Sequence, residues 1–394
     1  MHPQSEAGPA GRPLAGVRVL DLSRLLPGPF ATLLLADMGA SIDKLEDTSG
    51  GDYMRHMPPQ IGGENSIFLA LNRGKRSFVL DLKNPRGREA LLDLLPRYDV
   101  LIDQFRPGVL ARLGLSHETL RGRHPGLVVC AITGYGQTGP LAHRAGHDLN
   151  YLARGGVLGF QGPKDGPPAV PGFQIADIGG ALYCVVGVLA ALLARTRTGD
   201  GAVVDVSMME AAMGFAMSGF GTQFGAAVTR GDEPLTGGLA CYRTYETKDG
   251  QYMSLGALEP KFWLAFAAGV GLEADMGALV PGPHQADLTR RVAEIFAART
   301  RAEWEAFASE RDCCLEPVLT PVEAMADAHV KARRLFFKMQ SPWGEIDQMR
   351  LPFSREAPTR PPPRQGEHTE EILREAGFED ARIASLRAAG VLGG

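Results

Sequence analysis

The sequence predicts an α/β fold with a large domain built on a doubly wound, mostly parallel sheet and a smaller α+β domain. First, strand-like apolar runs alternate with helix-like segments from Leu14 to Ile132, a pattern typical of parallel sheets with helices on their faces. Second, a chain of 394 residues exceeds the length at which a single core stops growing, so two domains are expected. Third, the pattern changes after about Phe220 to a hairpin followed by helices.

The elements of the large domain follow from periodicity and local start signals. Alternation and β-branched content predict strands at residues 17–22, 41–45, 77–82, 100–102 and 127–132. Gly28-Pro29 begins a helix at residues 30–38, and Pro85 begins another at residues 85–95. Ser207 and Glu210 form a capping box that starts a helix to about Phe220.

The second half of the chain has different signals. Asp249-Gly250 predicts the turn of a hairpin within residues 244–255, followed by helices around 261–269 and 288–307. The proline run at 360–364 predicts an extended linker before a helix at 369–375. The expected domains are 14–225, 235–310 and a return to the large domain at 311–394, with residues 1–13 disordered.

Composition excludes several classes of protein. The chain is 44% hydrophobic and 22% charged with a net charge of −4, which predicts a soluble globular protein and argues against a nucleic-acid partner. The five cysteines at positions 130, 184, 241, 313 and 314 lack CxxC spacing, so neither a disulfide framework nor a metal site is expected. The N-terminus has no secretory signal pattern and the C-terminus no peroxisomal address, so cytoplasmic localisation is the default.

The most apolar run covers residues 178–194 and ends at Arg195. Its seventeen residues, three of them glycine, are marginal for crossing a bilayer, which needs about 20. The run is expected to be a buried helix that is apolar on all sides, with no membrane partner.

A glycine-rich segment follows the strand predicted at 127–132. Gly134, Gly136 and Gly139 match the pattern GxGxxG, but Pro140 follows at once and no acidic residue lies about 20 positions later at a strand end. The glycines are therefore expected to allow close approach in a loop rather than to bind a dinucleotide.

Six basic residues and one acid lie between Arg73 and Arg88, a local excess of +5 that Arg106 and Arg112 extend. Such a cluster is either a solvated face or a site for a phosphate-rich ligand, and its composition alone leaves both open.

His147 and Asp177 lie at the amino ends of two expected helices in glycine-rich surroundings. Taken singly, Asp177 is explained as a helix N-cap and His147 as a loop histidine. Together, beside backbone N–H groups that stabilise a developing anion, they could abstract a proton next to a carbonyl.

At these residues the chain resembles the family III CoA-transferase superfamily, and within it the α-methylacyl-CoA racemase branch. His147 with Asp148 and Glu259 is the mark of that branch. The segments that carry the resemblance are 134–140, 145–151, 177–180, 195–199, 256–260 and 366–369.

The resemblance implies an acyl-CoA substrate, no cofactor beyond its CoA moiety, and an interlocked homodimer with sites between one subunit's large domain and the other's small domain. His147 and Asp177 would be the two acid/base groups, Glu259 the carboxylate partner of His147, and Asp148 the donor of a backbone N–H to the enolate oxygen. The implied CoA contacts are Leu80, Lys83, Phe105, Arg106, Arg112, Tyr135 and the loop with Gly146, Asn150 and Tyr151. Asp47 replaces an arginine of the family pattern, which puts one adenosine-phosphate contact in doubt.

The expected reaction inverts the α-carbon of a 2-methylacyl-CoA thioester through an enolate, with one base on each face. In a CoA-transferase, Asp177 would instead be a nucleophile that carries the acyl group. A catalytically silent acyl-CoA-binding protein is a third reading. The chain retains His147 and has only Gly237-Gly238 where transferases of the best-known type have a glycine run, which favours the racemase.

Methionines recur on the helix that begins at the capping box, namely Met208, Met209, Met213 and Met217. At helical spacing they form either ordinary core or an adaptable acyl-binding surface.

Overall fold

The computed structural model describes residues 12–352 and 359–393 in two compact units. Unit 1 comprises residues 1–154, 174–215 and 329–394, and unit 2 comprises residues 155–173 and 216–328. The boundaries differ from the expected ones, because the helix predicted to reach Phe220 ends at Phe215 and the chain returns to unit 1 at His329. Of the segment expected to be disordered, residues 1–11 lie outside the described residues, and Arg12 begins a turn.

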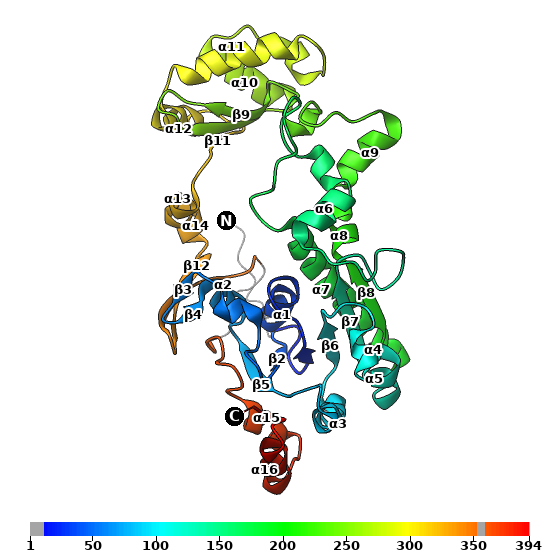
Figure 1. Cartoon of the computed structure of the whole chain (residues 1–394). Helices are drawn as coiled ribbons and strands as arrows, with labels where there is room; N and C mark the ends of the chain where they lie inside the picture. Colours follow the sequence, from blue (N-terminus) through cyan, green and yellow to red (C-terminus); the bar gives the residue numbers. More distant parts are fainter. Residues whose placement is uncertain (1–11, 353–358, 394) are drawn as a thin grey trace. The chain divides into compact units, whose positions relative to one another are not determined.

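Unit 1 contains a six-stranded parallel sheet of order β5-β2-β1-β6-β7-β8, as the sequence predicts (Figure 1). In the central strand, Val19 pairs with Ile42 on one side and Val100 on the other. The strands are β1 (Arg18–Asp21), β2 (Ser41–Glu46), β5 (Lys75–Val79), β6 (Val100–Asp103), β7 (Val128–Thr133) and β8 (Val203–Ser207). Strand β8 was not predicted, because it is an edge strand whose first residues are partly exposed and whose apolar pattern is weak.

Helices cover both faces of this sheet. On one face, α7 packs on β7 and β8 and against α1 and α8. On the other, Leu91 of α3 and Ile372 of α15 join Leu101 of β6 in one buried core. The helices are α1 (Pro27–Asp37), α2 (Ser66–Leu71), α3 (Pro85–Leu94), α4 (Val109–Arg112), α5 (His117–Arg123), α6 (Asp148–Arg154), α7 (Ile175–Thr198), α8 (Met208–Phe215), α15 (Thr369–Glu375) and α16 (Asp380–Ala388), with the 3-10 turns η1 (Tyr53–His56) and η2 (Leu95–Arg97).

Two hairpins complete the strands of unit 1. They are β3 (Gln60–Ile61) with β4 (Glu64–Asn65), and β12 (Phe336–Ser341) with β13 (Gly344–Met349). The proline run at 360–364 has no regular secondary structure, and it packs on the unit. Pro362 and Pro363 are buried, and the carbonyl of Pro363 accepts a hydrogen bond from Arg55.

Helix α7 was expected to be buried on all sides, but part of its surface is exposed. Its length and composition would suffice to cross a membrane, yet only 44% of its most apolar window is buried. Leu182, Tyr183, Val186 and Leu193 are exposed, because the sheet, α1 and α8 cover one side of the helix.

Unit 2 is a small α+β unit with an antiparallel sheet of order β11-β10-β9. The hairpin of β9 (Tyr242–Glu246) and β10 (Tyr252–Gly256) encloses the predicted Asp249-Gly250 turn. The helix expected at 288–307 is two helices, because Thr300 forms a capping box with Glu303 that starts a new one. The remaining elements are η3 (Val157–Phe160), α9 (Met217–Gly225), η4 (Pro234–Thr236), α10 (Pro260–Val270), η5 (Met276–Leu279), α11 (Gln285–Ala297), α12 (Arg301–Ser309), β11 (Leu315–Pro317) and α13 (Pro321–Ala326), with α14 (Ala328–Ala332) at the boundary of the units.

Candidate active site

A cavity of about 700 Å³ lies at the carboxyl ends of the parallel strands of unit 1, where ligands bind in open α/β sheets. Residues that follow β1, β5, β6 and β7 line it, among them Leu22, Leu80, Phe105 and Gly134. Of the residues singled out from the sequence, it brings together Leu80, Lys83, Phe105, Arg106, Arg112, Gly146, His147, Tyr151, Asp177 and Met208.

His147 and Asp177 enter the cavity from the starts of two helices, as predicted. His147 immediately precedes α6, where its carbonyl accepts from the N–H groups of Asn150 and Tyr151. The Asn150 side chain in turn accepts a hydrogen bond from the backbone N–H of His147. Asp177 is the third residue of α7. Neither the His147 ring nor the Asp177 carboxylate has a hydrogen-bond or ion-pair partner among the described residues.

The capping role considered for Asp177 belongs to Asp148. The Asp148 carboxylate accepts hydrogen bonds from the N–H groups of Ala176 (2.6 Å) and Asp177 (3.1 Å), which satisfies two free donors at the start of α7. As the first residue of α6, Asp148 has a backbone N–H without an acceptor inside the helix. Asp148 thus joins the two helix starts that carry His147 and Asp177.

The surroundings of Asp177 favour its protonated form. Burial, reinforced by the negative charge of Asp148, raises the pKa of Asp177 to about 7. A carboxyl group with this pKa exchanges protons readily at neutral pH, as a general acid or base must.

In the glycine-rich segment the expected close approach is found at Gly134, whereas Gly136 has only ordinary contacts and Gly139 has nothing within 4 Å of its Cβ position. A Cβ atom on Gly134 would lie 2.3 Å from the Tyr151 ring, and one on Gly146 would lie 2.7 Å from the same ring. The Tyr151 hydroxyl donates a hydrogen bond to the carbonyl of Gly146. The Tyr135 ring packs edge-on against the Tyr151 ring, with 5.1 Å between the ring centroids. These glycines seat Tyr151 beside His147. Tyr135 and Asn150 support this loop rather than line the cavity.

The basic cluster predicted at 73–88 is not one surface. Arg73 pairs with Asp37 inside the unit, and Arg76 pairs with Asp43, Glu371 and Glu375. Lys75 is fully buried, and burial lowers its pKa to about 7. Arg86 and Arg88 bond to Ser385 and to backbone carbonyls. In the described part of the cluster, Lys83 alone lines the cavity.

Two basic residues that were not predicted to belong to the site, Arg24 and Arg144, also line the cavity. With Lys83, Arg106 and Arg112 they make five basic side chains that line the cavity, and none forms an ion pair within the described residues. Arg24 lies three residues after the end of β1, and its place at the carboxyl end of a parallel strand is the signal that could have found it.

The methionine stripe is interrupted. Met208 lines the cavity, whereas Met209 and Met213 of α8 are half-buried outside its lining. Met217 belongs to α9 in unit 2 because the helix ends at Phe215. The prediction of one helix carrying all four methionines was therefore wrong.

Glu259 and Asp47 were also singled out from the sequence, and the structure places them in two different units. Glu259 is the N-cap residue of α10 in unit 2, and its role toward His147 stays a prediction from the resemblance. Asp47 lines the cavity, and its carboxylate accepts from the N–H groups of Ser49 and Gly51. Asp47 thus closes a turn in the cavity wall.

A profile of CoA-transferase family III matches residues 14–369 of the chain. The chain belongs to this family. Human alpha-methylacyl-CoA racemase is 38% identical over 386 residues, which cover 95% of this chain and 96% of the relative. Mouse succinyl-CoA:glutarate CoA-transferase is 31% identical over 410 residues, which cover 99% of this chain and 92% of the relative. A solved CAIB/BAIF family protein from Brucella suis has a TM-score of 0.80 and 30% identity, covering 93% of this chain and all of that one.

The family III fold agrees with the parallel sheet and helices of unit 1, and members of the family include racemases and CoA-transferases. An acyl-CoA substrate fits the family. The chain is therefore a family III enzyme, with relatives that catalyse two different reactions.

Proposed function

We propose that the protein is a racemase that inverts the α-carbon of 2-methylacyl-CoA thioesters by two-base proton transfer. The observation that carries the proposal is the pair of unpartnered acid/base groups, His147 and Asp177, on the wall of one cavity. Inversion needs one group on each face of the α-carbon. The raised pKa of Asp177 makes its carboxyl group a proton donor near neutral pH.

In one direction of the reaction, neutral His147 takes the α-proton and the electron pair moves onto the thioester oxygen as an enolate. Protonated Asp177 then gives its proton to the opposite face of the α-carbon. The product has the inverted configuration, and both groups return to their starting states after proton exchange with water. The reverse direction uses Asp177 as base and His147 as acid. We assign the backbone N–H of Asp148 to the enolate oxygen, as in an oxyanion hole.

The five basic side chains that line the cavity give the CoA phosphates a place there. Met208 supplies an adaptable apolar surface for the acyl chain near Asp177.

We further propose that the protein works as an interlocked homodimer in which Glu259 supports His147. The exposed apolar side chains of α7 support this proposal, because a monomer rarely leaves a contiguous apolar face in water.

The alternative is a CoA-transferase, in which the Asp177 carboxylate attacks the thioester carbonyl and CoA leaves as its thiolate, forming a mixed anhydride. The unpartnered Asp177 and the transferase relatives support this reading. The His147 ring on the same cavity favours the racemase.

The test is incubation with a 2-methylacyl-CoA in D₂O, followed by mass and chiral analysis. A racemase introduces deuterium at the α-carbon while CoA stays attached. His147→Ala and Asp177→Asn should each lower racemisation by at least about 10²-fold with unchanged far-UV circular dichroism. Racemisation within threefold of wild type in a folded variant would remove that residue from the mechanism. CoA transfer to an added carboxylate without α-deuteration would establish the transferase.

A further inference from the structure

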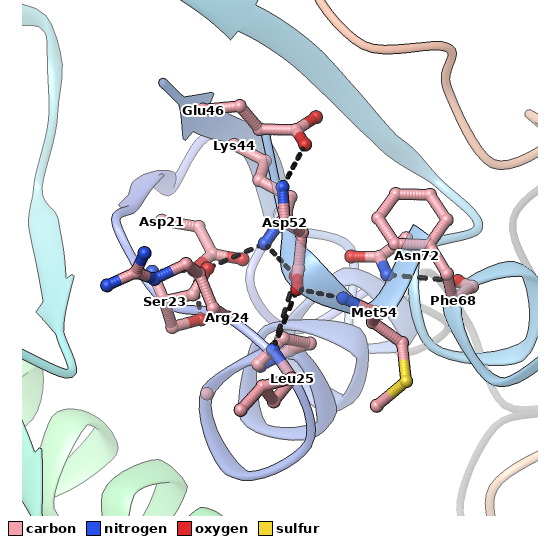
Figure 2. A network of polar contacts seen from close by, with 12 residues as sticks. Asp21, Ser23, Arg24, Leu25, Lys44, Glu46, Asp52, Met54, Phe68 and Asn72 are labelled. Atoms are coloured by element: carbon pink, nitrogen blue, oxygen red, sulfur yellow. Dashed lines mark hydrogen bonds and ion pairs between the residues drawn. The ribbon is translucent and has the colours of Figure 1, made fainter. Parts of the chain in front are cut away.

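A buried polar network, two of whose members line the cavity, has no part in the proposed proton transfers (Figure 2). At its centre, the Lys44 ammonium lies 3.0 Å from the Asp52 carboxylate, and both side chains are shielded from solvent. Asp21 and Glu46, also buried, contribute further negative charge to Lys44. Asp52 and Glu46 line the cavity, so this network lies where substrate binds.

Asp52 ties two separate parts of the cavity wall together. Its carboxylate accepts hydrogen bonds from the N–H of Leu25 (3.0 Å), in the loop between β1 and α1, and from the N–H of Met54 (3.1 Å), in η1. Its own N–H donates to Glu46 at 2.9 Å. Any shift of Asp52 therefore moves both the β1–α1 loop and η1.

The β1–α1 loop needs such support. Leu25 has a φ of 64°, a left-handed conformation that is unfavourable for a residue with a side chain. Lys44 donates to the carbonyl of Ser23 at 2.6 Å, and the Gln104 side chain accepts from the N–H groups of Arg24 and Gly28. The network thus holds the loop in a conformation that it would otherwise leave.

The two parts held by Asp52 carry side chains that meet. The guanidinium carbon of Arg24, from the loop, lies 4.5 Å from the centre of the Tyr53 ring in η1 and 5.3 Å from the centre of the Phe105 ring. All three side chains line the cavity. In Figure 2 the Arg24 side chain points away from Asp52 and Lys44. Two aromatic rings, rather than a carboxylate, fix the guanidinium, so its N–H donors stay available to an anion.

We propose that Asp52 is a positioning residue which, through Leu25 and Tyr53, holds Arg24 at the cavity wall as a fixed contact for the phosphate-bearing part of the substrate. This inference rests on the proposed CoA thioester substrate. It assigns Arg24 to the binding of the CoA part, and it assigns the Lys44–Asp52 pair to the placement of that contact.

The test is calorimetric titration of the full-length protein with free coenzyme A at low and moderate salt. The variants are Arg24→Gln, Asp52→Asn and the double variant. Asp37→Asn is the matched control, since Asp37 is equally buried and pairs with Arg73 outside this cavity. Arg24→Gln should weaken CoA binding about tenfold, the loss of one charge-assisted contact, and should make the affinity less dependent on salt.

If Asp52 is a positioning residue, the effect of Asp52→Asn on CoA binding must depend on the presence of Arg24. Asp52→Asn should weaken CoA binding in the wild-type background and cause little further loss when Arg24 is already Gln, because both changes remove the same contact. A merely structural role of Asp52 predicts equal losses in both backgrounds. Asp37→Asn should lower the melting temperature and leave CoA affinity unchanged.

Several outcomes overturn the inference. Unchanged CoA affinity and salt dependence in Arg24→Gln, a variant at a partly exposed position, would exclude the phosphate contact. Equal losses from Asp52→Asn in both backgrounds would exclude positioning through Arg24. If the wild type shows no α-deuteration but the titrations behave as expected, the proposed reaction is wrong and the Arg24 assignment stands. If the wild type does not bind CoA, both proposals fail.

Discussion

At the scale of single residues, opposing electrostatic effects determine the pKa of Asp177. Its place in the first turn of α7 favours a negative charge, because the N-terminal end of a helix is positive. Burial and the neighbouring Asp148 favour the neutral form, and these two effects prevail, so the pKa rises to about 7. Asp148 therefore has two effects on Asp177, since it caps the helix and also raises the pKa of the residue beside it.

This pKa predicts opposite pH dependences for the two candidate reactions. In either direction, racemisation needs one proton held by the pair of Asp177 and His147, so kcat/KM for both epimers should fall as the pH rises through about 7 and Asp177 loses its proton. A transferase needs the carboxylate as nucleophile, so its rate should rise through the same range. Initial rates from pH 5.5 to 8.5, measured separately for each epimer and for CoA transfer, check the sign.

Asp148→Asn provides the control for this assignment. It removes the negative charge that raises the pKa of Asp177 and keeps an oxygen that can cap α7. The limb of the profile that belongs to Asp177 should therefore move to lower pH. A limb that stays in place in Asp148→Asn, or one that persists in Asp177→Asn, would belong to another group.

At the scale of elements, the site depends on glycines that let a loop and a helix approach closely. Gly134 follows β7, and the ring of Tyr151 from α6 occupies the space where a side chain would lie. Since α6 begins directly after His147, the packing of Tyr151 sets the position of His147.

Gly134→Ala should therefore damage both stability and catalysis. The added methyl group would lie 2.3 Å from the Tyr151 ring, and such overpacking costs about 1–3 kcal/mol. We expect a lower midpoint of urea denaturation and a lower kcat, because α6 must shift.

Gly122→Ala is the matched control, because nothing lies within 4 Å of its Cβ position and it lies inside α5. Alanine there should be neutral or stabilise the protein by about 0.5–1 kcal/mol, with unchanged activity. Equal midpoints of urea denaturation for Gly134→Ala and wild type would contradict this prediction, because they would show that the loop accommodates the methyl group with no loss of stability.

At the scale of the whole molecule, unit 1 contains the cavity and most of the candidate site residues, whereas Glu259 and Met217 belong to unit 2. Within unit 1, helix α7 carries both a residue of the candidate active site and exposed apolar side chains. Its first turn carries Asp177, and further along the same helix Tyr183 and Val186 are exposed.

Val186→Glu should disrupt the proposed homodimer. Val186 is 61% exposed in the chain, so a charge there costs little in a monomer but would be buried in an interface. Sedimentation velocity should show a dimer for wild type and a smaller species for Val186→Glu. Ala384→Glu, at an exposed position of α16, should leave the dimer intact. A monomeric wild type at micromolar concentration, or a dimer unaffected by Val186→Glu, would contradict this interface.

Local sequence patterns were sufficient to predict several features of the fold. Five strands of the parallel sheet, the start of α3, the Asp249-Gly250 hairpin and the helix at Thr369–Glu375 all follow from periodicity, prolines and turn residues. Helix α1 begins at Pro27, earlier than the predicted range 30–38. The placement of His147 and Asp177 at helix starts was likewise available, since it depends on neighbours within a few positions.

The tertiary structure decided what depends on contacts between distant residues. It directed Arg73, Lys75 and Arg76 inward to acids elsewhere in the chain, although their spacing resembles that of a surface cluster. It also capped α7 with Asp148 from another helix, and it joined Asp52 to Leu25 across 27 positions. A charged side chain is free or paired according to what the fold brings within hydrogen-bond distance, and no local pattern contains that information.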